Sequence, residues 1–304
     1  MGHTRWDPKD WDRYSRSTAT KAADAIFVTK KLSPEMDPTK FEVRESRDST
    51  LNPLSTPVII GVDVTGSMGR LADYFVKKGL GIFFQETIDR KPVTDPHLMV
   101  MGIGDCIYDQ APIQVSQFEA DLTIAKWLEQ IFIEKCGGGN NFESYDLPYY
   151  IAAYKTSTDS WEKRNKKGYL FTLGDEMPPT KTSVADIKKF IGDAPQSDVI
   201  FKELIDKAQQ QYNCYHIIIA EGNFARSNLS KVKDAWVDLL GQNVIVLDDH
   251  TKLSEVLVSI MEINEGKDVD EVVSSWSGDT SLVVKSATQS LTKSNVDDLD
   301  VTFL

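Results

Sequence analysis

The chain has 304 residues, which is enough for one large domain with appendages or for two ordinary domains. Its composition, 41% hydrophobic and 26% charged with a mean hydropathy of −0.31, is typical of a soluble globular protein. A net charge of −12 argues against binding to a phosphate backbone, which needs clustered Lys and Arg, so we expect no nucleic-acid partner. No apolar run is long enough to span a bilayer, so we expect no membrane partner.

The cysteines and the first residues of the chain bear on its compartment. Cys106, Cys136 and Cys214 are odd in number and widely spaced, and they predict neither a disulfide framework nor a zinc knuckle. The basic residues near the start have no apolar stretch behind them, unlike those of a secretory signal. Together these features predict a reducing, cytoplasmic compartment.

Charge and residue pattern divide the chain into three parts. Residues 1–57 are polar and Pro-rich around one helical pattern at 19–27, and they predict an N-terminal arm that packs on the domain. Residues 58–265 hold most of the negative charge and are predicted to be the domain. Residues 266–304 are rich in Ser and Asp and predict an acidic, mobile C-terminal tail.

The domain alternates short apolar runs with amphipathic patterns. Continuously apolar strands that alternate with amphipathic helices predict an α/β fold, with a mostly parallel central sheet and helices on both faces. In open sheets of this kind ligands bind at the carboxyl ends of the strands. In chain order, strands are predicted at residues 58–63, 97–104, 111–115, 168–173, 215–220 and 244–247, and helices at 71–88, 118–133, 144–154, 198–211, 229–240 and 253–261.

The first predicted strand ends in a polar turn, Asp63-Val-Thr65-Gly-Ser67, that leads into a helix. Its carboxylate and two hydroxyls are hard oxygen donors, which suit magnesium or manganese better than zinc. A strand-to-helix turn can bring these three side chains around one point, with glycine allowing the tight curvature. The alternative is a polar turn in which Ser67 caps the helix.

A second polar loop, Cys136-Gly-Gly-Gly-Asn140-Asn141-Phe-Glu143, lies before a predicted helix. Three consecutive glycines lose much backbone entropy on folding, so some feature should require close approach or positive φ. The two amides and the glutamate after them favour a shaped, oxygen-rich loop over a flexible connector.

A third polar segment, Gly174-Asp175-Glu176, ends the strand at 168–173, and the Pro-Pro that follows fixes the direction of the chain. Carboxylates at a strand end are often solvated turn residues, but this strand is predicted to lie centrally, next to the first one. Asp105 and Asp109 form another carboxylate pair after the second strand, either as solvated loop residues or on the periphery of a metal site.

The three loops together resemble the von Willebrand factor type A family over residues 58–263. The metal-ion-dependent adhesion site of that family is built from an Asp-x-Ser/Thr-x-Ser loop, a Thr or Asp on a Gly-rich loop, and an Asp that ends a later strand. The resemblance implies a three-layer, Rossmann-like fold and a bound divalent ion: Mg²⁺, or else Mn²⁺ or Ca²⁺. The ligands that it implies are Asp63, Thr65, Ser67, Asn140 or Asn141, and Asp175.

This chain has an asparagine where the family usually has Thr or Asp, and an amide carbonyl is a legitimate ligand for magnesium or calcium. If Glu143 and Glu176 face away, Asp63 and Asp175 are the only close acidic groups, and in the family these act mostly through water. A divalent ion so weakly neutralised keeps an open position and attracts an external carboxylate, typically an Asp or Glu of a protein partner.

The resemblance therefore implies a metal-dependent protein-binding module, without enzymatic activity, that serves as an intracellular adaptor or scaffold. Many intracellular members of the family act beside an AAA+ ATPase, which makes such an ATPase a second implied partner. The last helix of the family can shift when ligand binds, so the helix at 253–261 is a hypothetical link between the site and the tail.

The alternative is a magnesium-dependent phosphatase of the haloacid-dehalogenase type, which also has an Asp at the first strand end and a later Gly-Asp. Its acid/base residue is a second Asp two positions on, where this chain has Thr65. Its later motif continues to another Asp, where this chain has Met-Pro-Pro-Thr. A P-loop is excluded because the first loop has no Gly-Lys-Ser/Thr.

Overall fold

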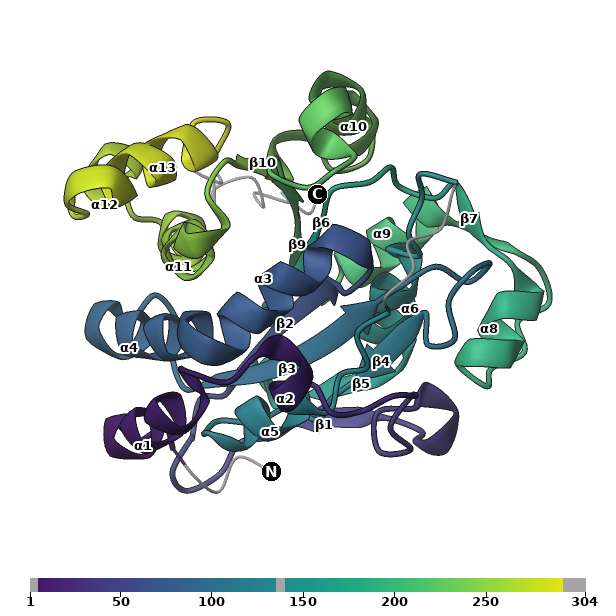
Figure 1. Ribbon diagram of the computed structural model, residues 1–304, viewed down its shortest axis with the longest axis horizontal. Coiled ribbons are helices and arrows are strands. Elements are labelled where there is room, and N and C mark those ends of the chain that lie inside the picture. Colours follow the sequence, from purple (N-terminus) through teal and green to yellow (C-terminus); the bar gives the residue numbers. More distant parts are fainter. Residues whose placement is uncertain (1–4, 135–139, 292–304) are drawn as a thin grey trace, which may run out of the picture.

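The computed structural model describes residues 5–134 and 140–291, except for the side chain of Ser67. Cys136 and the three glycines after it lie outside the described residues. A six-stranded sheet in the order β10-β9-β6-β2-β3-β4 forms the centre (Figure 1). All neighbours pair in parallel except β3 and β4, which are antiparallel. The strands are β2 (Thr56–Asp63), β3 (Pro96–Ile103), β4 (Ile113–Val115), β6 (Gly168–Gly174), β9 (Tyr212–Ile219) and β10 (Val244–Leu247).

The central strands are covered on both faces, as their uninterrupted apolar sequences predict. Every residue of β2 is buried. Successive side chains of a strand point to opposite faces, so Ile60 belongs to one hydrophobic core and Ile59 to the other. The predicted α/β fold with a mostly parallel sheet is therefore confirmed, and β6 lies beside β2 as expected.

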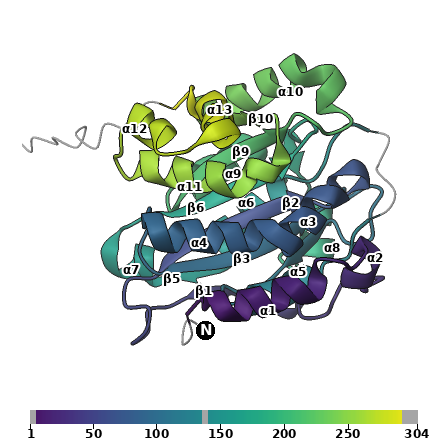
Figure 2. The same cartoon turned by 60° about the vertical axis from the view of Figure 1, so that its left-hand side comes forward.

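One face is covered by a long helix that leaves the first loop and by the last helix of the domain (Figure 2). The long helix consists of α3 (Gly69–Tyr74), the π-helical turn η3 (Phe75–Gly79) and α4 (Leu80–Arg90). Phe75 and Phe83 of this helix share a core with Leu257 of the last helix. This layer also includes α5 (Thr123–Glu129) and α11 (Leu253–Asn264).

The other face is covered by helices whose core is rich in aromatic rings. Trp236 lies in edge-to-face contact with Tyr145 and with Phe201. Two short strand pairs flank this layer, one parallel and one antiparallel. The helices are α6 (Asp146–Tyr154), α7 (Asp159–Arg164), α8 (Val184–Phe190), α9 (Phe201–Ala208) and α10 (Ala225–Leu240), and the strand pairs are β1 (Arg44–Ser46) with β5 (Thr156–Thr158) and β7 (Lys181–Thr182) with β8 (Val199–Ile200).

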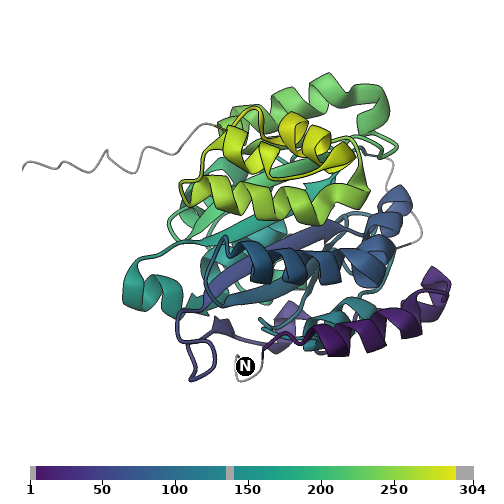
Figure 3. The same ribbon diagram turned by 90° about the vertical axis from the view of Figure 1, so that its left-hand side faces the viewer.

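The N-terminal arm lies along the first of these faces, with α1 (Pro8–Thr18) beside α4 (Figures 2 and 3). The ring of Trp6 stacks on Phe84 with centroids 4.3 Å apart. The helix expected at 19–27 is wrong in its bounds, because Asp7 caps a helix that begins at Pro8. The expected segment holds only the four-residue α2 (Ala23–Ile26). After it come η1 (Pro38–Lys40) and β1.

The stretch expected to be a mobile tail instead contains two helices, α12 (Val269–Ser274) and α13 (Gly278–Thr288). Asp268 caps α12, and Val272 and Val284 are buried in the core that α11 also lines. The physical reason for the difference is that a few buried apolar residues suffice when a neighbouring helix supplies the rest of the core. Residues 292–304, the last part of the predicted tail, lie outside the described residues. Over the described part of the chain, no helix combines the length and apolarity needed to cross a membrane.

Candidate metal centre

The first loop is held by hydrogen bonds that begin at Asp63, the last residue of β2. Asp63 is completely buried, and its Oδ1 accepts hydrogen bonds from the backbone N–H of Thr65 (2.8 Å) and from Thr65 Oγ1 (2.7 Å). Its Oδ2 accepts a hydrogen bond from Tyr145 Oη (3.2 Å). Asp63 therefore orients Thr65. Ser67 lies in the turn η2 (Gly66–Met68), and its side chain is outside the part that the structure describes.

A cavity of about 280 Å³ lies at the carboxyl ends of β2 and β6, where the three loops meet. Of the predicted ligands, the structure brings Thr65, Asn141 and Asp175 together around it. Sequence reasoning did not single out Asn223, which also faces it. The residues that line the cavity are Thr65, Gly66, Asn141, Asp175, Glu176, Asn223 and Phe224.

The two asparagines of the second loop separate, and only Asn141 lines this cavity. Asn141 has φ of 61°, a left-handed conformation that Asn tolerates better than most residues. Its carbonyl accepts a hydrogen bond from the backbone N–H of Met177 (3.3 Å), which ties the second loop to the third. Asn140 instead donates from Nδ2 to Asp105 Oδ2 (2.7 Å). Of the two residues, Asn141 is thus the one that faces this cavity.

Asp175 is positioned by the loop that follows β9. Its Oδ2 accepts a hydrogen bond from the backbone N–H of Phe224 (2.8 Å). A Cβ on Gly222 would collide with the Asp175 side chain, so glycine at this position allows the loop to approach. Burial raises the pKa of Asp175, although backbone hydrogen bonds from Phe224 and Ala225 partly offset this effect.

The condition under which Asp63 and Asp175 would be the only close acidic groups is not met, because Glu143 and Glu176 also lie close to the site. Glu143 is only 2% exposed, and its Oε1 lies 3.0 Å from Thr65 Oγ1. Glu176 lines the cavity itself. The sequence signal for both was their position directly beside the predicted ligands, but backbone spacing does not show which way a side chain turns.

The pKa values of Asp63, Glu143 and Glu176 are raised, first by burial and then by the charges of neighbouring carboxylates. For both Asp63 and Glu143 burial is the largest cause, and neighbouring carboxylates add to it. Burial, followed by the charges of Asp175 and Asp105, raises the pKa of Glu176 to about 7. Within residues 5–134 and 140–291, no Lys or Arg forms an ion pair with any of these acids.

The donors present fit a hard divalent cation. The cavity offers a hydroxyl, two amides and two carboxylates, all oxygen donors of the kind that Mg²⁺, Mn²⁺ and Ca²⁺ take. Glu143 Oε2 and Glu176 Oε2 are buried and have no hydrogen-bond partner within the described residues. A cation bound in the cavity would satisfy the orphaned oxygen of Glu176, which lines it.

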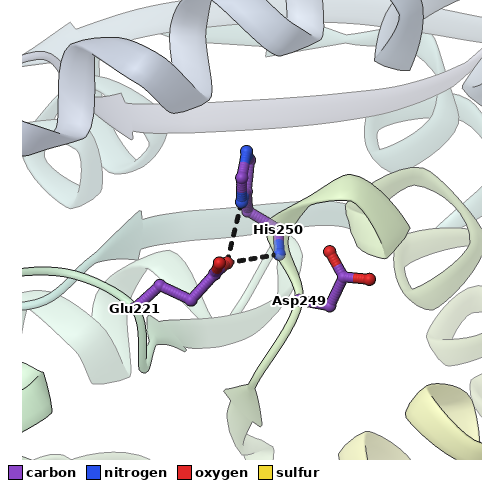
Figure 4. Close-up of side chains that lie close together, drawn as sticks. All are labelled: Glu221, Asp249 and His250. Atoms are coloured by element: carbon purple, nitrogen blue, oxygen red, sulfur yellow. Dashed lines mark hydrogen bonds and ion pairs between the residues drawn. The ribbon is translucent and has the colours of Figure 1, made fainter.

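A second cluster of candidate metal ligands lies beyond β9 and β10 (Figure 4). His250 Nδ1 lies 2.7 Å from Glu221 Oε2, which also accepts a hydrogen bond from the His250 backbone N–H (2.8 Å). Asp249 Oδ1 accepts hydrogen bonds from the N–H and Oγ1 of Thr251 and so caps η5 (His250–Lys252). These bonds account for the cluster as a His–Glu hydrogen bond beside a helix cap.

A larger cavity of about 460 Å³ lies at the amino end of β3. It is bounded by Trp6, Phe84 and Pro96 and holds none of the predicted ligands. The predicted ligands that face a cavity therefore lie at the opposite end of the strands, the carboxyl end.

Comparison with known proteins finds solved structures that are similar to this chain. No family model and no curated protein matches the sequence. A von Willebrand factor type A protein from Catenulispora acidiphila is similar with a TM-score of 0.40 and 17% identity, over 70% of this chain and 43% of that one. The pilus adhesin SpaC from Lactobacillus rhamnosus GG has a TM-score of 0.44 and 9% identity, over 73% and 32% of the two chains. The pilus adhesin RrgA from Streptococcus pneumoniae has a TM-score of 0.35 and 8% identity, over 69% and 44%.

The chain thus spans less than half the length of each of these three proteins. At such TM-scores and identities the likenesses carry no argument about what this chain binds.

Proposed function

We propose that the chain is a protein-binding module that uses a divalent metal ion, Mg²⁺ or else Mn²⁺ or Ca²⁺, held in the cavity at the carboxyl end of the sheet. The observation that carries the proposal is the convergence of Thr65, Asn141 and Asp175 from three loops on one cavity. Asp63 also supports the proposal. Its Oδ1 accepts hydrogen bonds from the backbone N–H and the Oγ1 of Thr65, and these bonds fix the direction of the Thr65 hydroxyl.

The chain's own residues would divide the work between binding and positioning. Thr65 and Asn141 offer neutral oxygens to the ion, and Asp175 and Glu176 offer negative charge. Asp63 and Tyr145 hold the first loop from the buried side. When bound, a divalent ion supplies a Lewis-acid centre that can accept a carboxylate from outside. The partner is therefore a protein with an accessible Asp or Glu, and an AAA+ ATPase is one class that the family resemblance suggests.

The phosphatase alternative is disfavoured by the surroundings of Asp63. A nucleophilic aspartate must present a free carboxylate oxygen to its substrate. Both oxygens of Asp63 already accept hydrogen bonds, and the residue is completely buried. We expect p-nitrophenyl phosphate hydrolysis with Mg²⁺ to be the same for the wild type and for Asp63→Ala.

The experiment that tests the proposal is thermal unfolding in EDTA, Mg²⁺, Mn²⁺ or Ca²⁺. Binding to the native state stabilises it by mass action, by about 2.7 kcal/mol when the free metal is at 100 times its Kd. We expect the unfolding midpoint of the wild type to rise with at least one of these ions. The rise should disappear in Asp63→Ala and in Thr65→Val, which removes the hydroxyl and keeps the carboxylate.

Asp206→Ala, which changes an exposed carboxylate of α9, is the matched control and should respond to metal as the wild type does. A wild type whose midpoint is the same in EDTA and in all three ions would overturn the proposal. An equal rise in Asp63→Ala and Thr65→Val would place the metal elsewhere.

A further inference from the structure

The larger cavity, at the amino end of β3, lies at the opposite end of the sheet from the cavity proposed for the ion, which we call the metal cavity. Its volume is about 460 Å³. Leu54 and Ile88, which line it, are 47% and 41% exposed, so apolar side chains of this cavity are open to solvent. Exposed apolar hollows are typical of sites that receive another apolar segment. We call this space the apolar cavity and define it by the side chains of Trp6, Leu54, Phe84, Ile88, Val93 and Pro96.

The charge around the apolar cavity is positive, although the chain as a whole has a net charge of −12. Two cations, Arg5 and Lys91, and one acid, Asp95, line it. Asp95 is already paired, since its Oδ1 lies 3.3 Å from Arg5 and its Oδ2 accepts a hydrogen bond from the backbone N–H of Leu54 (3.0 Å). Lys91 is exposed and forms no ion pair within residues 5–134 and 140–291. The cavity therefore suits an occupant with negative charge beside apolar side chains.

One segment of the chain itself has this composition. Residues 296–304 read Val-Asp-Asp-Leu-Asp-Val-Thr-Phe-Leu and contain three acids, no base and five large apolar residues. They follow closely on Leu291, the last residue that the structure describes. Residues 1–4, which directly precede Arg5 and Trp6, match the cavity less well because they have no acidic side chain.

The described part of the chain stops at the same end of the sheet as the apolar cavity. Ser290 Oγ donates to the backbone oxygen of Gln242 (3.2 Å), which belongs to η4 (Gly241–Asn243) just before β10. Figure 2 shows α13 beside β10 at one side of the sheet and α1 at the other. Between these two sides lies the amino end of β6, where Lys167 is exposed and, over the described ranges, has no ion pair.

The distance from β10 to the apolar cavity is within reach of residues 292–304. β3 lies four strands away from β10, which corresponds to about 19 Å at the usual spacing of strands. The strand pairings put Val244 level with Met101, five residues beyond Pro96, which adds about 17 Å along the strands. The two components together give about 25 Å, whereas thirteen extended residues span about 43 Å. The same molecule can therefore supply the occupant.

We propose that residues 296–304 dock in the apolar cavity of the same molecule. The Phe303 side chain enters the cavity, and the three aspartates of the segment face Lys91 and Lys167. Tethering favours this arrangement over binding to another copy, because it gives the segment a high effective concentration. Since Trp6 belongs to the N-terminal arm, the docked segment links the two ends of the chain outside the predicted domain. The inference does not depend on the proposed metal site.

The test is photo-crosslinking of the full chain with Phe303→p-benzoylphenylalanine. We expect irradiation of a dilute sample to give a monomeric product whose crosslinks, mapped by peptide mass spectrometry, lie at Trp6, at Leu54 or within residues 84–96. Ile88→Glu combined with Lys91→Glu should lower this yield at least about fivefold, because an apolar contact is lost and a charge that attracts the aspartates is reversed. The matched control, Lys78→Glu with Gln85→Glu, makes the same change of charge at exposed positions of the same long helix and should leave the yield unchanged.

A second measurement changes only the segment, which lies outside the described fold. Leu299→Asp with Phe303→Asp removes two apolar side chains, whereas the control Ser294→Asp with Thr302→Asp adds the same charge and keeps them. We expect amide hydrogen exchange of residues 84–96 to be about fivefold faster in the first variant than in the control, because a covered surface opens less often.

Each outcome decides on the inference. Crosslinks that map away from the apolar cavity, or whose yield is the same in the two charge variants, would overturn it. Crosslinked dimers whose share rises with protein concentration would overturn the assignment to the same molecule in favour of a second copy. Equal exchange in the two segment variants would contradict docking. None of these outcomes bears on the proposed function.

Discussion

Asn140 and Asn141 are adjacent and chemically identical, yet they face different cavities. The cause is local backbone geometry, since Asn141 adopts a positive φ and turns its side chain away from that of Asn140. Asn140 donates to Asp105, whereas Asn141 faces Thr65 and Asp175 across the metal cavity. An Asn→Asp substitution at each of the two positions therefore tests which residue holds the ion and which only supports the loop.

We expect Asn141→Asp to bind Mg²⁺ about tenfold more tightly than the wild type, because a carboxylate replaces a neutral amide at the cavity and Asp tolerates positive φ. Asn140→Asp should gain no affinity, because its new charge faces Asp105 and loses the hydrogen bond from Nδ2. Isothermal titration with Mg²⁺ measures both. Equal affinities for the two variants would contradict the assignment of Asn141.

At this scale the sequence predicts the types of ligand but not their directions. The loop Asp63-Val-Thr65-Gly-Ser67 predicted a carboxylate and hydroxyls as oxygen donors, and the structure adds that the Thr65 hydroxyl donates to Asp63. Nothing in the order of residues showed that Glu143 bends back to Thr65. That contact depends on how the segment just before α6 packs against the first loop, where Tyr145 also donates to Asp63, and such packing is a tertiary property.

The helices of the first face are joined by a buried charge. Glu262 of α11 is completely buried, and its Oε2 accepts hydrogen bonds from Arg90 Nε (3.1 Å) and Nη2 (2.6 Å). Its Oε1 is 2.6 Å from Lys267 Nζ, just before α12. The Arg90 guanidinium also lies 4.0 Å from the ring centre of Trp276. One carboxylate thus connects α4, α11 and the segment that leads to α13.

We expect Glu262→Gln to lower the free energy of unfolding by about 3 kcal/mol, because removal of one member of a buried ion pair leaves its partners uncompensated. Urea denaturation followed by circular dichroism measures the change. Glu203→Gln, on the exposed side of α9, is the matched control and should change stability little. If both variants lose the same stability, the buried charge does not hold these helices together.

Helices and strands were predictable from the sequence where the pattern of apolar residues is strong. The strand at 244–247 agrees with β10, and the helix at 71–88 lies within the continuous helix from Gly69 to Arg90. The helix at 118–133 is shorter than predicted, since α5 covers only Thr123–Glu129. The helices α12 and α13 were missed because their stability comes from docking on α11 and β10.

The behaviour of the whole molecule in acid depends in part on a buried histidine. His97 of β3 is 1% exposed, and its Nδ1 lies 3.1 Å from Ser46 Oγ of β1. Burial lowers the pKa of His97 to about 4. Because this lies below the ordinary value near 6.5, the unfolded chain binds a proton in a range where the folded protein does not.

His97 therefore contributes its full stability above pH 6.5, and this contribution is lost as the pH falls from about 6.5 to about 4. The loss amounts to about 3 kcal/mol at the lower end, at 1.36 kcal/mol for each unit of pKa difference. Urea denaturation of wild type and His97→Gln at a series of pH values measures it.

The difference in stability between wild type and variant should show this loss, because the other groups with shifted pKa values, such as His216 and Glu176, contribute equally to both proteins. A slope that is unchanged in His97→Gln would mean that His97 takes up no proton on unfolding.

Gly81 is far from the N-terminal arm in sequence, but the arm leaves no room for a side chain at this position. Gly81 lies on the outer side of α4, where a Cβ would collide with the ring of Trp11. The missing side chain at Gly81 thus makes room for the indole ring of Trp11. Without the arm, a residue with higher helix propensity at this position would make the helix more stable. In related chains the two positions should change together: an alanine or larger residue at 81 would mark a chain whose arm is lost or runs elsewhere, and a tryptophan at 11 would appear with glycine.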